Sequence, residues 1–371
     1  MSILETHEIS YRYNSRQERP SVKEVSISIG EGRRTAILGA NGAGKSTLFY
    51  HFNGVFKPQS GEVLYRGVPL DYSKDALREL RSEVCVVVQN PDEQIFSSTV
   101  EEDVAFGPLN LGLSRDEVEE RITDALDMVG MTAFRSRPST QLSYGQRKRV
   151  SLAGALAVNP KVMILDEPTA GLDPQMSQEV MELIDQLCFT GTSVIVSTHD
   201  VDLAYAWADD VDVLRLGRLV YSGMPEGFFR DPVQTAFAGL CRPHSFSLNS
   251  YMMQIRGQDE IPYPKTNSQL LARMMSGSVE PGVVRIVPVA EGSVPSKADG
   301  QTSGAYGFAA KKAMRDSEIN PDYVFDAVEM CMIDAVKGID TVLYCDASIA
   351  EPVAERVRSL GTYGISPKVI L

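Results

Sequence analysis

The residues best suited to chemistry form one octapeptide, Gly39 to Ser46, which reads GANGAGKS. It fits the phosphate-binding pattern G-x-x-x-x-G-K-[ST]. An apolar run, residues 35–38, precedes it, and a helix-compatible run, residues 47–52, follows, so the pattern has the strand–loop–helix context that phosphate binding needs. In such a loop, Lys45 would reach the β- and γ-phosphates of ATP and the Ser46 hydroxyl would bind Mg²⁺.

Glycines make this loop suitable for phosphate. Because they lack a Cβ, backbone N–H groups can close around phosphate oxygens, and the helix start adds unpaired donors and a positive dipole end. The alternative is a glycine-rich turn with a chance lysine, and the flanking runs count against it. The nucleotide-binding residues predicted here are Gly39, Asn41, Gly42, Gly44, Lys45, Ser46 and Thr47.

ATP hydrolysis also needs a carboxylate for Mg²⁺ and a group that orients the attacking water. The apolar run at residues 162–165 ends in Asp166 and Glu167. Open α/β sheets bind their ligands at the carboxyl ends of the strands, so we expect Asp166 to hold Mg²⁺ and Glu167 to polarise water. An Asp-Glu pair after a strand is common by itself, and its weight here comes from the phosphate loop.

Composition narrows the classes of function. The net charge of -13 argues against non-specific nucleic-acid binding, which requires a basic surface. The five cysteines are scattered and form no C-x-x-C pair, which favours reduced thiols over a zinc site or disulfides. No apolar run reaches 18 residues and no signal peptide begins the chain, so we expect membrane work to require a partner.

The order of strand-like and helix-like stretches predicts an α/β fold in two parts. Residues 1–240 alternate buried strands with helices, and residues of about 100–155 are a helical insertion. In the insertion, Ser114 and Glu117 form a capping-box pattern. The composition shifts near residues 242–244. The pattern of strand-like and helix-like stretches in residues 245–371 then predicts a smaller α/β domain of unknown role. Glycines at 304 and 307 precede a helix there; close packing is the favoured interpretation and a small-ligand loop the alternative.

Leu142-Ser143-Tyr144-Gly145-Gln146 resembles the LSGGQ signature of ABC-type ATPases, with Tyr144 in place of a glycine. The other motifs of that family follow in chain order, and together they cover roughly residues 1–240. The resemblance implies a P-loop NTPase fold and the following site residues. Gln89 is the Q-loop residue that contacts nucleotide and Mg²⁺, and residues 171–174 form the D-loop. His199 is the switch histidine, which makes it a catalytic residue together with Lys45 and Glu167. Tyr13 stacks on adenine, and Ser143, Gly145 and Gln146 bind nucleotide.

Alternatives remain for single residues. Tyr11 competes with Tyr13 for the adenine, His199 could be an ordinary histidine at a strand end, and Gln89 could merely end a strand. Ser143 could be a plain helix N-cap, although a helix start is also an anion site. In the family, the signature faces the phosphate loop of a second subunit. The resemblance therefore implies a dimer, either of two copies of this chain or of this chain with a second ATPase subunit. The effect of Tyr144 in the signature motif stays open.

Residues 89–96 and 99–108 resemble the ATPases of energy-coupling-factor importers, most of all the cobalt and nickel members. That resemblance implies a transmembrane coupling subunit, a substrate-capturing membrane protein, and a peripheral location on the cytoplasmic face of the membrane. Vitamin importers share these motifs, so the cargo could instead be a vitamin. A soluble ABC ATPase without transport is the other alternative. The acidic charge and the single phosphate loop count against it.

Overall fold

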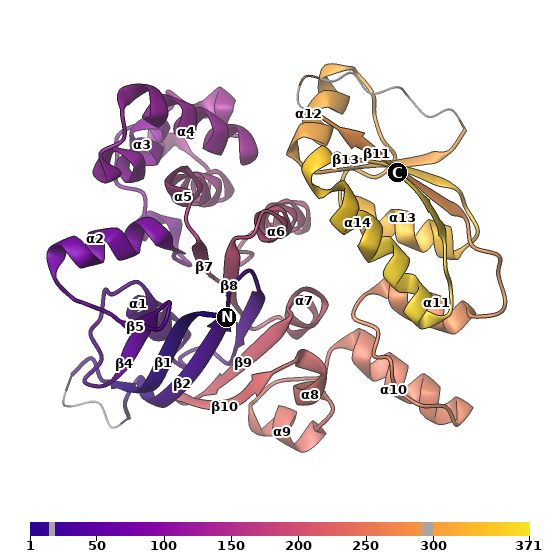
Figure 1. Cartoon of the computed structure of the whole chain (residues 1–371), viewed down its shortest axis with the longest axis horizontal. Coiled ribbons are helices and arrows are strands. Elements are labelled where there is room, and N and C mark those ends of the chain that lie inside the picture. The colour runs from indigo at the N-terminus through magenta and orange to yellow at the C-terminus, as the bar shows by residue number, and fades with distance from the viewer. Residues whose placement is uncertain (15–18, 291, 293–299) are drawn as a thin grey trace. The chain divides into compact units, whose positions relative to one another are not determined.

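A computed structural model describes residues 1–14, 19–290, 292 and 300–371 of the chain (Figure 1). It contains two compact units: residues 1–177 with 191–241, and residues 178–190 with 242–371. Helix α6 (Pro174–Phe189) therefore begins in the first unit, and its residues from 178 onward pack with the second. The sequence predicts that all of this helix belongs to the first domain, whereas the structure groups its residues from 178 onward with the second unit.

The first unit is built on a six-stranded sheet with the order β10-β9-β3-β8-β7-β6. The strands from β9 to β6 are parallel, and β10 is antiparallel to β9. Parallel strands that are buried on both faces have continuous apolar sequences, and the sequences of β7 and β8 fit this pattern. The bounds are β3 (Arg34–Leu38), β6 (Val84–Val87), β7 (Val162–Asp166), β8 (Ser193–Thr198), β9 (Asp210–Arg215) and β10 (Arg218–Gly223).

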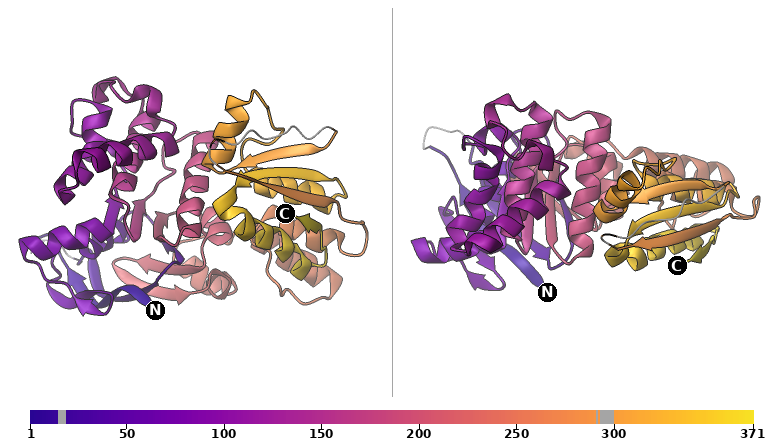
Figure 2. Two further views of the ribbon diagram at one scale, coloured as in Figure 1. Left: turned by 45° about the horizontal axis from the view of Figure 1, so that its top comes forward. Right: turned by 90° about the horizontal axis from the view of Figure 1, so that it is seen from above.

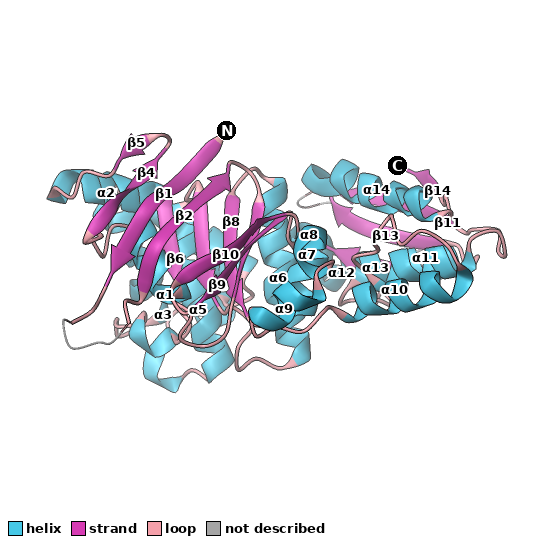
Figure 3. Cartoon of the chain, turned by 90° about the horizontal axis from the view of Figure 1, so that it is seen from below, coloured by secondary structure: helices cyan, strands magenta, loops and turns pink. Residues whose placement is uncertain are grey.

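A second, antiparallel sheet has the order β2-β1-β4-β5. Its strands are β1 (Ser2–Tyr11), β2 (Val22–Gly30), β4 (Ser60–Tyr65) and β5 (Val68–Pro69). Burial alternates along β2, because one face of this sheet meets the core and the other meets water. Leu48, Phe49 and Phe52 of helix α1 (Lys45–Phe52) join the apolar residues of both sheets in one core. The helix that follows the phosphate loop is therefore held by residues of both sheets. Figure 3 shows the strands of the two sheets.

The helical insertion contains α3 (Val100–Leu111), α4 (Arg115–Met128) and α5 (Tyr144–Val158), which gather together in Figure 1. Ser114 and Glu117 form the predicted capping box. Val118, Ile122, Ala125 and Leu126 are buried, as the helical spacing predicts. Helix α2 (Lys74–Glu83) precedes β6, and α7 (Val201–Trp207), α8 (Pro225–Phe229) and α9 (Pro232–Phe237) follow β8.

The second unit contains a parallel sheet with the order β12-β13-β11-β14 (Figure 2). Alternate residues of the central strand face two apolar clusters, because side chains alternate along a strand. Leu343 and Cys345 pack with residues of α11, α13 and α14, and Val342 and Tyr344 pack with residues of α12. The bounds are α10 (His244–Arg256), α11 (Asn267–Met275), β11 (Val283–Val289), β12 (Thr302–Tyr306), α12 (Phe308–Asp316), α13 (Ala327–Val336), β13 (Thr341–Asp346), α14 (Ala350–Arg358) and β14 (Lys368–Ile370).

Two charged contacts fix α6 within the second unit. The Glu182 carboxylate accepts hydrogen bonds from the Lys311 ammonium and from the N–H of Asp326, the latter at 3.1 Å. Arg356 lies 3.4 Å from the Asp185 carboxylate. Burial is the main cause that raises the pKa of Glu182. A cut after residue 241 would therefore remove the partners of α6, and truncation tests must allow for that loss.

The glycine loop before α12 is explained by packing inside the second unit. The Asp346 carboxylate accepts a hydrogen bond from the N–H of Ala310 at 2.7 Å. Gly307 has φ 98°, and a Cβ at this position would overlap the same carboxylate. The chain's own carboxylate therefore fills the helix start where a phosphate would bind, which favours close packing over the small-ligand alternative.

A buried carboxyl in the first unit makes its stability depend on pH. Asp212 of β9 is 2% exposed, and burial raises its pKa to about 7, with a further rise from Asp210 opposed by a hydrogen bond from Ser222. Folding therefore favours the protonated carboxyl. Its contribution is complete below the ordinary pKa of 3.8 and is lost as the pH rises through about 7.

We expect Asp212→Asn to raise the thermal midpoint at pH 8, because asparagine removes the cost of a buried charge. The gain should be clearly smaller at pH 5, which lies inside the window between 3.8 and about 7. For a domain of this size, each kcal/mol corresponds to about 2–4 °C, so several degrees are expected. Calorimetry at both pH values measures this effect. The same change at exposed Asp71 is the control, and an equal gain at both pH values would contradict the assignment to Asp212.

Candidate nucleotide site

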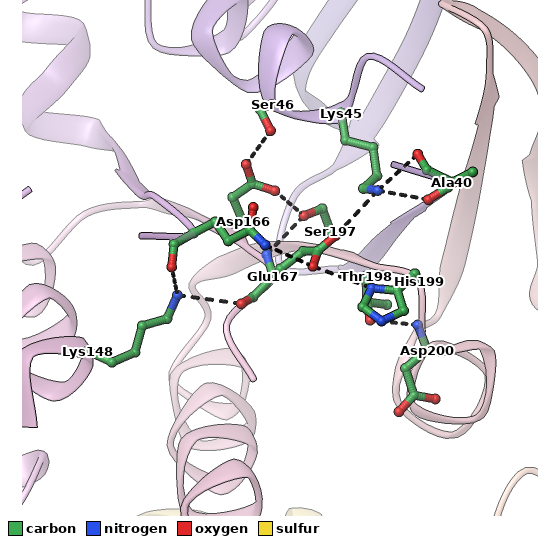
Figure 4. Close-up of polar contacts among 12 residues, drawn as sticks. Ala40, Lys45, Ser46, Lys148, Asp166, Glu167, Ser197, Thr198, His199 and Asp200 are labelled. Atoms are coloured by element: carbon green, nitrogen blue, oxygen red, sulfur yellow. Dashed lines mark hydrogen bonds and ion pairs between the residues drawn. The ribbon is translucent and has the colours of Figure 1, made fainter. Parts of the chain in front are cut away.

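A pocket of about 320 Å³ lies at the carboxyl ends of β3 and β7. Parallel strands bring their carboxyl ends to one edge, so the loops after β3, β6 and β7 meet there. The lining residues are Tyr13, Ser21, residues 41–47, Gln89, Asp166 and Glu167. Figure 4 shows the polar contacts at this edge.

Glycines set the backbone of the phosphate loop. Gly44 stands directly before α1 with φ 106°, a conformation that residues with a Cβ rarely adopt. A Cβ at Gly44 would overlap the carbonyl of Ser21, and one at Gly39 would overlap the carbonyl of Leu214. The loop is thus held against neighbouring backbone, with the start of α1 directed at the pocket.

Lys45 is buried at 6% exposure, although lysine is rarely buried without partners. Its Nζ donates to the carbonyl oxygens of Gly39 at 2.8 Å and Ala40 at 3.4 Å. The same ammonium lies 3.5 Å from Oε1 of Glu167. A positive charge is therefore fixed inside the loop, where it can meet phosphate oxygens.

Asp166 is connected to two hydroxyl groups. Ser46 Oγ donates to its Oδ2 at 2.5 Å, and Ser197 Oγ donates to its Oδ1. Mg²⁺ prefers oxygen ligands and binds through one or two carboxylates together with substrate phosphates. A serine hydroxyl and a carboxylate that already converge, with the Gln89 carboxamide also lining the pocket, fit that ion.

Glu167 follows β7 with a backbone φ of 45°, a strained conformation for a residue with a side chain. Such strain is concentrated at functional sites. Its backbone N–H donates to the carbonyl and hydroxyl of Ser197. Oε2 accepts from Nε2 of Gln89 at 3.2 Å and lies 3.4 Å from Nδ1 of His199. The carboxylate, 7% exposed, is therefore held by Lys45, Gln89 and His199. Figure 4 shows Lys45 and His199 beside Glu167.

The structure separates the two tyrosines that compete for adenine. Tyr11 stacks on Phe56 with ring centroids 4.8 Å apart and is partly buried against the core. Tyr13 is 48% exposed, lines the pocket, and is hydrogen-bonded through its hydroxyl to Thr47 at 3.0 Å. Tyr13 therefore stays the predicted stacking residue, since its ring borders the pocket.

The signature segment, residues 142–146, does not line this pocket in the described part of the chain. Ser143 caps α5 and forms a capping box with Gln146, as its N-cap interpretation predicts. Among the described residues that line the pocket, none comes from residues 142–146. A role for Ser143, Gly145 and Gln146 in nucleotide binding therefore needs a second subunit.

Tyr144, the departure from the signature pattern, contacts its own chain. A Cβ on Gly171 of the D-loop would lie 3.0 Å from the Tyr144 ring, so the two groups are neighbours. The Tyr144 hydroxyl donates to the carbonyl of Gln89 at 3.5 Å. The ring therefore lies against the D-loop, and exposed Ser143 remains accessible to a partner.

Sequence reasoning missed Ser197 and Lys148. Ser197 is the penultimate residue of β8 and pairs with Asp166 in the sheet. A small polar residue near the carboxyl end of an apolar strand is the signal that could have found it. Lys148 is 3% exposed, and its Nζ donates to the carbonyl of Gln89 at 2.7 Å. Burial lowers the pKa of Lys148 to about 8, although Asp166 and Glu167 act in the opposite direction. Its place on a polar helix gave no signal.

Known proteins share this fold and these motifs. A family described as ABC transporter matches residues 22–170. The energy-coupling factor transporter ATP-binding protein EcfA2 of Methanospirillum hungatei is 34% identical over 96% of this chain and 92% of its own length.

Two solved structures are also similar. CbiO1 of Clostridium perfringens, part of the ABC transporter complex cbiONQ, is 39% identical with a TM-score of 0.57, over 68% of this chain and 99% of its own. A dimeric ATP-binding cassette in a post-hydrolysis state with ADP and Pi is 29% identical with a TM-score of 0.56, over 61% and 100%.

One of these similarities extends beyond the nucleotide-binding unit. The Methanospirillum relative aligns with nearly the whole chain, including the second unit. The chain therefore belongs to the ATP-binding proteins of energy-coupling factor transporters, within the ABC transporter family.

Proposed function

We propose that this chain uses ATP hydrolysis to drive a membrane importer for cobalt or nickel ions. Transport-coupled ATP hydrolysis is the activity of its family. The observation that carries the proposal is the convergence of Lys45, Glu167, Gln89 and His199 beside one pocket. Each supplies what phosphoryl transfer needs, namely charge stabilisation and orientation of the nucleophile.

In this proposal the chain's own groups divide the work. Lys45 and the N–H groups of the phosphate loop bind the β- and γ-phosphates, while Tyr13 stacks on adenine. Ser46, Asp166 and Gln89 would hold Mg²⁺, which neutralises phosphate charge when bound. Glu167 accepts a proton from the attacking water, and His199, beside the same carboxylate at 3.4 Å, helps to orient it.

A dimer would complete the site. Ser143 is exposed at the start of α5, where unpaired backbone donors attract anions. Ser143, Gly145 and Gln146 would therefore bind the γ-phosphate held by a second subunit. The dimeric cassette with ADP and Pi supports this arrangement. The partner would be either a second copy of the chain or a related ATPase subunit.

A surface beside the Q-loop suits a transmembrane subunit. Phe96, Phe106 and Leu109 are 65%, 49% and 60% exposed, and the two phenylalanine rings meet edge to face at 4.7 Å. Contiguous exposed apolar side chains mark interaction sites, and an amphipathic helix could cover them. In the described part of the chain, no helix is long and apolar enough to cross a bilayer. We therefore place the chain at the cytoplasmic face of the membrane, bound to a transmembrane coupling subunit and, through it, to a substrate-capture protein.

Support for the cargo comes from similarity. Residues 89–96 and 99–108 resemble those of cobalt and nickel importers, and CbiO1 is a structural neighbour. The name of the Methanospirillum relative specifies no cargo, and a vitamin is the alternative.

Uptake by the complete transporter tests the proposal. The chain is purified with its membrane subunits and reconstituted in vesicles loaded with ATP. Complexes whose ATPase subunit faces the lumen should drive accumulation of radioactive cobalt in the lumen. The Glu167→Gln complex should accumulate at least about 100-fold more slowly. Nickel and a set of vitamins are measured in parallel. ATP-driven uptake of a vitamin alone would replace the cargo and keep the motor, whereas uptake of any cargo that is indifferent to ATP would contradict the motor itself.

A further inference from the structure

Lys148 lies where three parts of the nucleotide site meet. It projects from α5, the helix that begins at the signature serine, and is 3% exposed. Its Nζ donates to the carbonyl oxygens of Gln89 at 2.7 Å and Val88 at 3.3 Å, both at the end of β6. The same Nζ is 3.5 Å from the carbonyl oxygen of Glu167, which follows β7 (Figure 4).

These contacts fix the backbone of the two residues whose side chains meet. Nε2 of Gln89 lies 3.2 Å from Oε2 of Glu167. One ammonium binds the main chain of both, and hydrogen bonds from a charged donor are stronger than those between neutral groups. Burial makes loss of this donor costly. The carbonyl groups of Val88 and Glu167 would lose the Lys148 contact, and the Gln89 carbonyl would keep only the longer hydrogen bond from the Tyr144 hydroxyl at 3.5 Å. Lys148 thus holds Gln89 and Glu167 at a set separation.

Other contacts attach the Q-loop to the same helix but do not reach Glu167. Arg147 forms an ion pair with Asp92 at 2.6 Å, and Nε2 of Gln94 donates to the carbonyl of Ser151 at 3.2 Å. Among the described contacts between α5 and residues 88–94, those of Lys148 alone continue to the residue after β7. A displacement of α5 would therefore be passed to Glu167 through this side chain.

We propose that Lys148 is a positioning residue for ATP hydrolysis, which keeps Gln89 and Glu167 in register and connects their backbone to the signature helix. This inference rests on the proposed ATPase function. Because Ser143 at the start of α5 would meet the nucleotide of a second subunit, Lys148 would also report occupancy of that site to the Glu167 carboxylate of its own chain.

Kinetics of the full chain separate positioning from simple stabilisation. Lys148→Met keeps the length of the side chain and removes its donors, and Lys148→Arg restores donors. Lys161→Met is the matched control, because Lys161 is exposed at the opposite end of β7. Turnover, KM for ATP, affinity for an ATP analogue and the thermal midpoint are measured for each variant. The kinetic and binding assays are run at a temperature well below the lowest thermal midpoint.

We expect Lys148→Met to lower kcat at least about tenfold and to leave KM and analogue affinity within about threefold, since binding groups are untouched. Lys148→Arg should recover part of kcat. In a Gln89→Ala background the same Lys148→Met change should cost much less, because residues that act through one another are not additive. Lys161→Met should match the wild type.

Three outcomes would overturn the inference. One is an unchanged kcat in Lys148→Met. Another is parallel loss of kcat, analogue affinity and thermal midpoint in both Lys148 variants, which indicates a structural role alone. The third is full additivity with Gln89→Ala. Failure of the proposed function is distinguishable, because it would remove ATP turnover from the wild type and Lys161→Met as well.

Discussion

Glu167→Gln should lower ATP turnover by about 100- to 1000-fold and leave MgATP affinity within about threefold of the wild type, as expected for loss of a general base. Glutamine keeps the shape of the side chain and can still pair with Gln89, which lies 3.2 Å from Oε2. What it loses is the ability to accept a proton from water. Binding should persist because the phosphate contacts come from Lys45 and the loop.

The same variant should accumulate as an ATP-bound dimer. If closure of two subunits follows ATP binding and hydrolysis reopens them, blocking hydrolysis leaves the closed state populated. Size-exclusion chromatography with and without ATP measures this, and Glu62→Gln, the same change at an exposed strand position, is the control. Turnover close to that of the wild type would remove Glu167 from the catalytic role, and a monomer in saturating ATP would contradict the dimer.

Strain at Glu167 explains why this residue is sensitive to its surroundings. Its φ of 45° is held by hydrogen bonds from its N–H to Ser197, and conformations of this kind cost of order 1–3 kcal/mol. The register of β7 and β8 places Ser197 opposite Asp166. The sheet therefore stabilises a backbone geometry that directs the carboxylate into the pocket.

Local motifs made much of this site predictable. The phosphate loop, the Asp166–Glu167 pair and the N-cap at Ser143 are short patterns whose geometry depends on neighbours in the sequence. The α/β alternation likewise indicated a parallel sheet, because buried strands read as apolar runs. Family resemblance then supplied Gln89 and His199, which the structure places within 3.2 Å and 3.4 Å of Glu167 oxygens.

Contacts between distant elements were not predictable. Lys148 sits among arginines on a polar stretch and reads as a solvated residue, yet the packing of α5 against β6 buries it at 3% exposure. Residues 178–190 belong to the second unit, where Glu182 and Asp185 meet Lys311 and Arg356, which are more than a hundred positions away. No periodicity in α6 carries that information.

Tyrosine placement shows the same limit. Tyr11 and Tyr13 are two positions apart, and alternation along a strand puts both on one face. In the structure, Tyr11 stacks on Phe56 at 4.8 Å, whereas Tyr13 meets Phe56 edge to face at 5.5 Å and lines the pocket. The sequence could present both candidates and could not choose between them.

Lys45→Ala should produce the opposite pattern to Glu167→Gln: ATP binding itself should weaken by about 100-fold or more. Lys45 supplies a buried ammonium 2.8 Å from the Gly39 carbonyl, and charge-assisted hydrogen bonds to phosphate contribute about 1.5–3 kcal/mol each. Its removal also leaves Asp166 and Glu167 without the cation 3.5 Å from Glu167, so the site would repel an anionic ligand.

Equilibrium titration with a fluorescent ATP analogue measures the affinity of the Lys45→Ala chain, and its thermal midpoint without nucleotide reports whether it folds. Lys57→Ala is the matched control, since this lysine lies over the ring of Tyr72 at 5.3 Å and does not line the pocket. In the wild type, ATP should raise the thermal midpoint, because a ligand that binds the folded state stabilises it. In Lys45→Ala that rise should disappear at the same ATP concentration. Normal affinity in a folded Lys45→Ala chain would refute the assignment of the phosphate loop, and with it the placement of ATP beside Glu167.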